Sequence, residues 1–83
     1  MKTPRYFDEQ VLPRRPTIRL EWCEAALTHP ARRDFQTDGR IRHWGTVLLP
    51  GETVVRYLRV VTLSDGETVH NAFLDRGFRE GIP

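Results

Sequence analysis

The 83-residue sequence lacks most of the features that tie a chain to a membrane or to an oxidising compartment. Its only cysteine, Cys23, excludes an internal disulfide, and no hydrophobic run approaches the roughly 20 residues that cross a membrane. The N-terminus is polar and has no apolar segment of the kind found in signal peptides. We therefore expect a soluble cytoplasmic protein that has no membrane partner.

Motifs for metal, cofactor or nucleophile chemistry are also missing. The three histidines, at positions 29, 43 and 70, and the single cysteine do not have the spacing of metal ligands. No glycine-rich phosphate loop follows a strand-like segment. The sequence therefore predicts neither a metal site nor a cofactor.

Lysine is almost absent, because Lys2 is the only one of the 13 basic residues that is not arginine. The planar guanidinium of arginine binds phosphate through paired hydrogen bonds and stacks on aromatic rings. Codon usage in a GC-rich genome would produce the same excess of arginine. With a net charge of +2, the composition is compatible with a nucleic-acid partner without demanding one.

The longest strand-like stretch runs from Arg40 to Arg76. Residues 54–63 are almost all β-branched, aromatic or leucine, with two arginines between them. The segments Ser64-Asp65-Gly66-Glu67 and Pro50-Gly51 are typical of hairpin turns. Together these patterns predict three antiparallel strands.

The residues before this stretch predict one helix and one further strand. Thr17 is a suitable N-cap and Pro30 a stop for a helix, which we expect to pack on the sheet. Its expected apolar stripe is Ile18, Trp22, Ala25, Ala26 and His29. Residues 33–37 can pair with the strand that starts at Arg40 across a turn at Asp38-Gly39, and would form an edge strand.

Residues 1–16 contain three prolines and no sustained hydrophobic period, so we interpret them as an N-terminal arm, by default a partly ordered tail. Its candidate anchors are Tyr6, Phe7, Val11 and Leu12. Residues 17–83 then form a single α+β domain in which one main helix packs on a three- to four-stranded antiparallel sheet.

The register of the last hairpin decides which side chains share a face, because a shift of one residue turns a whole strand over. A two-residue loop at Asp65-Gly66 places Ala72 opposite Arg59. A three-residue loop with a glycine bulge would place Asn71 there instead. We favour the first register, because it separates apolar from basic side chains.

In that register the sheet has two unlike faces. The apolar face consists of Ile41, Val47, Leu49, Val54, Leu58, Val60, Val69 and Phe73, with His43, Thr62 and Asn71 as polar members. The open face consists of Arg40, Arg42, Trp44, Tyr57, Arg59 and His70, with Val61, Ala72 and Leu74 between them. Arg56 lies opposite Asp75 as a structural ion pair, and Phe78 returns to the core.

The open face has the residue types that metal-free ribonuclease chemistry needs: a base, an acid, and cations that stabilise the phosphate. Arg59 and His70 are expected to be diagonal neighbours within reach of one phosphate. Aromatic rings on the same face can stack on bases. The candidate catalytic residues are Arg59, His70 and Arg42, and the candidate substrate-binding residues are Arg40, Trp44 and Tyr57.

The helix that ends at Pro30, followed by DGRIRHW, RYLRVVTL and DGETVHNAFLDRGF, resembles small bacterial proteins that are similar to RelE- and BrnT-like toxins of toxin–antitoxin pairs. The resemblance covers residues 17 to 78. It implies a RelE-like fold and a ribonuclease that acts on RNA, alone or at the ribosome, and is held inactive by a cognate antitoxin. The resemblance implies that Arg59 occupies the position of the strand arginine of these toxins, and that His70 occupies the position of their late catalytic residue.

Three functions are left open. The first is a toxin-type endoribonuclease with its site on the open face. The second is a non-catalytic module that binds a protein or a nucleic acid through the same face. The third is a structural subunit of a homo-oligomer, in which an exposed patch of Trp44, Tyr57, Val61 and Leu74 forms the interface.

Overall fold

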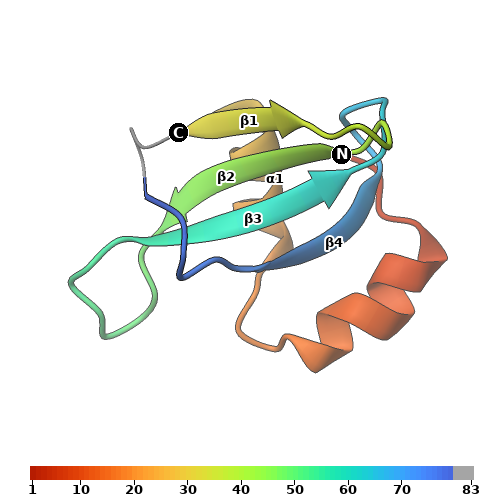
Figure 1. Ribbon diagram of the computed structural model, residues 1–83. Coiled ribbons are helices and arrows are strands. Elements are labelled where there is room, and N and C mark those ends of the chain that lie inside the picture. The colour runs from red at the N-terminus through yellow and green to blue at the C-terminus, as the bar shows by residue number, and fades with distance from the viewer. Residues whose placement is uncertain (80–83) are drawn as a thin grey trace.

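The computed structural model describes residues 1–79 and shows, within them, a four-stranded antiparallel sheet in the order β1-β2-β3-β4. One α-helix lies across one face of this sheet (Figure 1). The elements are α1 (Leu20–Thr28), β1 (Arg32–Phe35), β2 (Ile41–Val47), β3 (Arg56–Thr62) and β4 (Val69–Leu74). The expected α+β architecture, including the fourth strand at the edge, is confirmed.

The contact between α1 and β2 is close because β2 has a glycine where the helix crosses it. A Cβ atom on Gly45 would lie 2.7 Å from the Cβ and 2.8 Å from the Cα of Ala26. Small side chains therefore face the sheet, and both Cys23 and Ala26 are buried. Burial raises the pKa of the Cys23 thiol to about 11, so the thiol is neutral and unreactive at neutral pH.

The structure corrects two expectations about the helix, its first residue and its buried face. The helix begins at Leu20 rather than Thr17, and Arg19 occupies the N-cap position without a side-chain hydrogen bond. Ala25 and His29 are exposed, and Trp22 is only partly buried at the margin of the core. The predicted stripe is confirmed for Ala26 and for Ile18, which lies before the helix, and is wrong for Ala25 and His29. Trp22 stays at the margin because the tight contact at Gly45 selects small side chains rather than the large indole.

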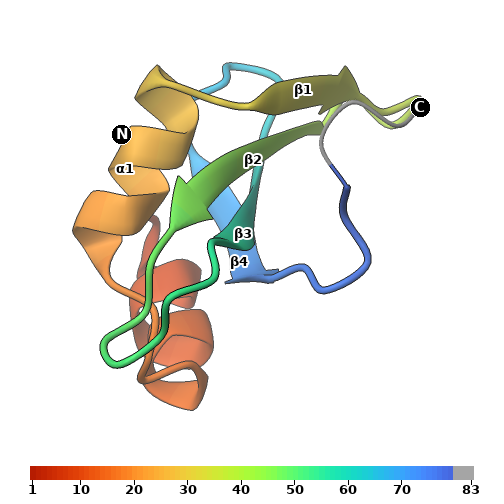
Figure 2. The same cartoon turned by 90° about the vertical axis from the view of Figure 1, so that its left-hand side faces the viewer.

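The N-terminal residues form two short helical segments, η1 (Phe7–Val11) and η2 (Leu12–Arg14), which lie on the same side of the sheet as α1 (Figure 2). Phe7 is fully buried and Val11 nearly so, and both belong to the main core. Of the other candidate anchors, Leu12 packs against that core and Tyr6 is exposed. The chain start is held by backbone hydrogen bonds from the Lys2 amide to the Glu67 carbonyl and from the Val69 amide to the Lys2 carbonyl.

The pairing of β3 with β4 changes at a bulge, where β4 has one extra residue. Thr62 lies opposite Val69, as the expected loop requires, but beyond His70 the register has shifted and Arg59 lies opposite Phe73. Neither expected partner of Arg59, Ala72 or Asn71, is therefore correct. The extra residue turns the rest of the strand over.

The bulge reverses four expected orientations. Ala72 and Leu74 pack into the core on the helix side. Phe73 and Asn71 lie opposite Arg59 and Val61 and so share the open face with them. Val54 was also misplaced, because β3 starts only at Arg56 and leaves it 70 % exposed in the preceding loop.

The pairing of β2 with β3 follows the expected parity. Trp44 lies opposite Arg59, Arg42 opposite Val61 and Thr46 opposite Tyr57, so these side chains share one face as predicted. His43 is buried on the helix side, also as predicted. In residues 1–79 no helix has the length and apolar character that crossing a membrane requires.

Candidate functional site

The open face of the sheet is partly covered by the segment that follows β4, residues 75–79, which runs on the side opposite α1 (Figure 2). Phe78 stacks on Trp44 with ring centroids 4.8 Å apart and meets Tyr57 edge-on at 4.9 Å. Phe78 is thus buried as expected, but against the open face instead of the helix-side core.

The stack with Phe78 removes the Trp44 ring from solvent. Only 3 % of the residue is exposed, so the expectation of an indole that stacks on bases is wrong. The four residues of the expected oligomer patch also do not form one exposed surface. Trp44 is covered by Phe78, and Leu74 faces the helix side.

Between this segment and the strands lies a cavity of about 380 Å³, which we call the open-face cleft. Its lining residues are Arg32, Asp34, Arg42, Trp44, Arg59, Asp75, Gly77, Phe78 and Arg79. Among residues 1–79, four guanidinium groups and two carboxylates line it.

Arg59 is held at the centre of the cleft by Asp75. Its Nε and Nη2 donate to Asp75 Oδ2 at 3.0 and 2.8 Å, and Trp44 Nε1 donates to the same oxygen at 2.9 Å. The guanidinium carbon lies 5.5 Å from the Trp44 ring centroid and 4.8 Å from that of Phe73. Arg59 is therefore fixed in orientation by one carboxylate and two aromatic rings.

The pKa of Asp75 is the result of opposing effects. Burial raises it, but the hydrogen bonds from Trp44 and Arg59, together with the Arg59 charge, outweigh burial and hold the pKa below its ordinary value. The carboxylate is thus ionised at neutral pH and compensates the charge of Arg59.

Sequence reasoning missed this role of Asp75 because it paired Asp75 with Arg56. The bulge shifts β4 so that the Asp75 amide bonds to the Tyr57 carbonyl, at 2.8 Å, and its side chain turns to the open face. Arg56 instead pairs with Glu52, at 3.3 Å. Periodicity offers no signal that could have located Asp75, because a bulge breaks the alternation on which the register depends.

Two other cations of the cleft, Arg32 and Arg42, also have polar partners. Arg32 Nε lies 3.2 Å from an Asp34 carboxylate oxygen. Arg42 donates to the Gln36 side-chain oxygen at 2.7 and 2.9 Å when that amide is oriented with its oxygen toward the guanidinium. Arg42 and Arg59 share the open face, as predicted, and both line the cleft.

Two predicted site residues lie elsewhere. Arg40 is exposed outside the cleft, 3.9 Å from an Asp38 carboxylate oxygen. His70 sits in the bulge, stacks on Tyr6 at a centroid distance of 6.2 Å, and faces a different cavity beside Gln10 and Val11. The expected diagonal contact between His70 and Arg59 is wrong, because the bulge and the N-terminal segment draw the imidazole to the edge of the sheet.

Among residues 1–79, no group of three or more histidine, cysteine, aspartate or glutamate side chains is placed to hold a metal ion. Comparisons with protein-family models, with curated proteins and with solved structures found no match for this chain. The cleft and its arginines are thus the observations from which a function can be inferred. Their geometry suits the binding of an anion with several oxygens, such as a phosphate.

Proposed function

We propose that this protein is a small RNA-binding module whose open-face cleft holds backbone phosphates. The observation that carries the proposal is the placement of Arg42 and Arg59 in one cavity that, among residues 1–79, is lined by more arginines than carboxylates. Guanidinium groups make paired hydrogen bonds to phosphate oxygens, and such contacts supply most of the affinity of sequence-independent nucleic-acid binding.

The Asp75 carboxylate favours this role as well. It fixes the Arg59 guanidinium before any ligand arrives, so less side-chain freedom is lost when a phosphate binds. It also lowers the net charge of the site, so the affinity is expected to be moderate and strongly dependent on salt.

A second candidate is the toxin-type endoribonuclease that the resemblance implies, with a RelE-like fold, a cognate antitoxin and RNA or the ribosome as its partner. The presence of Arg42 and Arg59 in one cleft favours it, because cations there would stabilise a pentacovalent phosphate. The carboxylates of Asp34 and Asp75 are the acid–base groups within the cleft, whereas His70 faces another cavity. Cleavage therefore has less geometric support than binding.

The test is the affinity for a single-stranded RNA of about 12 nucleotides, measured by fluorescence anisotropy at low and moderate salt. Arg42→Ala and Arg59→Ala are each expected to raise Kd by about tenfold, the effect of losing about 1.4 kcal/mol of binding energy. Arg5→Ala is the matched control, because Arg5 is exposed, pairs with Glu9 and lines neither the cleft nor its neighbourhood.

Equal Kd values for all four proteins, or no binding by the wild type at low salt, would contradict the proposal. The same RNA is then run on a denaturing gel. Intact RNA after incubation with the wild type favours the binding module. Cleavage by the wild type that is lost in Arg59→Ala but kept in His70→Ala would assign the endoribonuclease to the cleft.

A further inference from the structure

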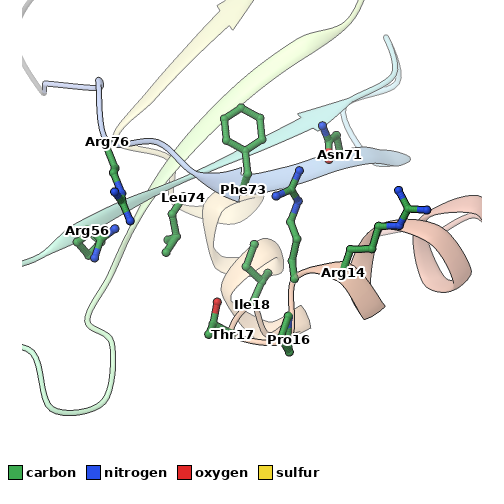
Figure 3. A pocket seen from close by; sticks show the side chains of 10 residues that line it. Arg14, Pro16, Thr17, Ile18, Arg56, Asn71, Phe73, Leu74 and Arg76 are labelled. Atoms are coloured by element: carbon green, nitrogen blue, oxygen red, sulfur yellow. The ribbon is translucent and has the colours of Figure 1, made fainter.

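A second cavity, of about 470 Å³, lies between the N-terminal segment and the outer edge of β4, and we call it the arm pocket. Its lining residues are Arg14, Arg15, Pro16, Thr17, Ile18, Arg56, Asn71, Phe73, Leu74 and Arg76. Figure 3 shows Arg56 and Arg76 on one side of it and Arg14 on the other. It has no lining residue in common with the open-face cleft.

The arm pocket is strongly basic. Of the residues that the structure describes, four arginines line it and no acidic residue does. Glu52, the ion-pair partner of Arg56, does not line the pocket. Its carboxylate therefore holds the Arg56 guanidinium without occupying the pocket. Asn71 uses its side-chain oxygen to accept the Ala72 amide at 2.9 Å, which leaves its amide NH₂ as the group that can donate. The natural occupant of such a pocket is an anion rich in oxygen atoms.

Phe73 links this pocket to the open-face cleft. Its ring centroid lies 5.7 Å from the guanidinium carbon of Arg15, which lines the arm pocket, and 4.8 Å from that of Arg59, which lines the cleft. Basic groups therefore continue from the cleft, across the half-buried Phe73 ring on β4, to the arm pocket. Both guanidinium groups lie over the Phe73 ring, so this ring joins the basic groups of the cleft to those of the arm pocket.

We propose that the arm pocket is a second phosphate site for the same RNA, so that one strand runs from the open-face cleft across Phe73 and around the edge of β4. This inference rests on the RNA binding proposed above and adds the path of the ligand. The path turns from one face of the sheet to the edge beside the arm, within a molecule whose longest extent is 32 Å. A flexible single strand can follow such a turn, whereas a duplex resists bending over this distance.

The test compares two double variants that lose the same charge. Arg15→Gln/Arg76→Gln removes two cations of the arm pocket and keeps side chains of similar length. Arg5→Gln/Arg19→Gln removes two exposed arginines that line neither cavity. Urea unfolding of each variant confirms that it is folded before binding is measured.

With an RNA of about 12 nucleotides, the arm-pocket variant is expected to raise Kd by about tenfold. It is also expected to flatten the plot of log K against log salt by about 1.4, the loss of two phosphate contacts on a single strand. The control variant is expected to retain the wild-type slope. An arm-pocket variant that has the same Kd and slope as the control overturns the inference.

The outcome for Arg42→Ala in the same series separates this inference from the function on which it rests. If Arg42→Ala weakens binding and the arm-pocket variant does not, RNA binds at the cleft and the arm pocket is not a second site. A wild type that binds no RNA would remove both.

Discussion

The two faces of the sheet are closed by different kinds of contact. On the helix side, Leu58 and Val60 have no solvent exposure, and Gly45 lets the backbone of α1 approach β2. On the open side of the same two strands, Trp44 is sealed by Phe78 and joined to Arg59 through one carboxylate oxygen. One face is closed by apolar area, and the other by an aromatic stack and a set of charged hydrogen bonds.

The two kinds of contact respond to different changes. Apolar burial is non-directional and scales with the area removed from water, so it is insensitive to pH and weakly sensitive to small shifts. Charged hydrogen bonds depend on geometry and on protonation. We infer that the helix face supplies most of the stability, and that the open face supplies a charge arrangement that acid or a single substitution can disturb.

The largest expected effect is on the helix face. Leu58→Ala should lower the free energy of unfolding by about 2–5 kcal/mol, because it removes fully buried methyl groups and leaves a cavity. Val54→Ala is the control, an apolar truncation four residues earlier at an exposed position, with an expected change within about 0.5 kcal/mol. Urea unfolding measures both, and equal losses would show that the core is not where the structure puts it.

On the open face, Asp75→Asn should cost about 1–3 kcal/mol, because it removes the charged acceptor shared by Arg59 and Trp44. The pKa of Asp75 is lowered in the folded state, so its contribution is complete above the ordinary carboxyl value of 3.8 and is lost as pH falls through the folded-state value. The wild type should therefore lose its advantage over Asp75→Asn as the pH falls below 3.8.

The comparison must be the difference between the two proteins rather than the acid sensitivity of the wild type alone. The pKa of Asp65 is also lowered, to about 2, mainly by its side-chain hydrogen bond with Thr68, followed by backbone hydrogen bonds from Thr68 and Glu67. That effect is present in both proteins and cancels. A difference that stays constant from pH 7 to pH 2 would contradict an ionised Asp75 at the centre of the cleft.

Most of the architecture was predictable from the sequence, because it depends on local signals. Asp-Gly and Pro-Gly turns separate the strands, and alternation assigns Arg42, Tyr57 and Arg59 to one face. The short edge strand was predictable for the same reason, since Asp38-Gly39 forms the turn and Gly39 has the positive φ, +90°, that favours glycine.

The candidate site was predicted only in part, because it depends on one inserted residue and on contacts distant in sequence. Alternation assumes an unbroken strand, and the bulge at His70 invalidates it from Asn71 onward. The burial of Trp44 depends on Phe78, which is 34 positions away and separated from it by two hairpins. Periodicity in the sequence indicates neither the bulge at His70 nor the contact between Trp44 and Phe78.

The smallest expected effect concerns His43, a polar residue within the apolar face. Burial lowers the pKa of His43, and the charge of Arg33, which lies opposite it on β1, lowers it further. Its Nε2 contacts Thr62 Oγ1 at 2.9 Å, while its buried Nδ1 has no hydrogen-bond partner within residues 1–79. A charged imidazole would carry a proton on both nitrogens and would leave the Nδ1 proton unpaired in the core.

The sign of the pH dependence follows from this lowered pKa. The unfolded chain binds the proton more readily than the folded one, so stability from His43 is complete above pH 6.5 and decreases as pH falls toward the folded-state pKa. The free energy of unfolding of the wild type should therefore decline from pH 7.5 to pH 5.5 more steeply than that of His43→Gln, which keeps a polar side chain but cannot titrate. Because Asp65 and Asp75 titrate at lower pH, this window isolates the imidazole. Parallel curves for the two proteins would mean that His43 accepts a proton as easily when buried as in the unfolded chain. Water would then reach the core between α1 and the sheet.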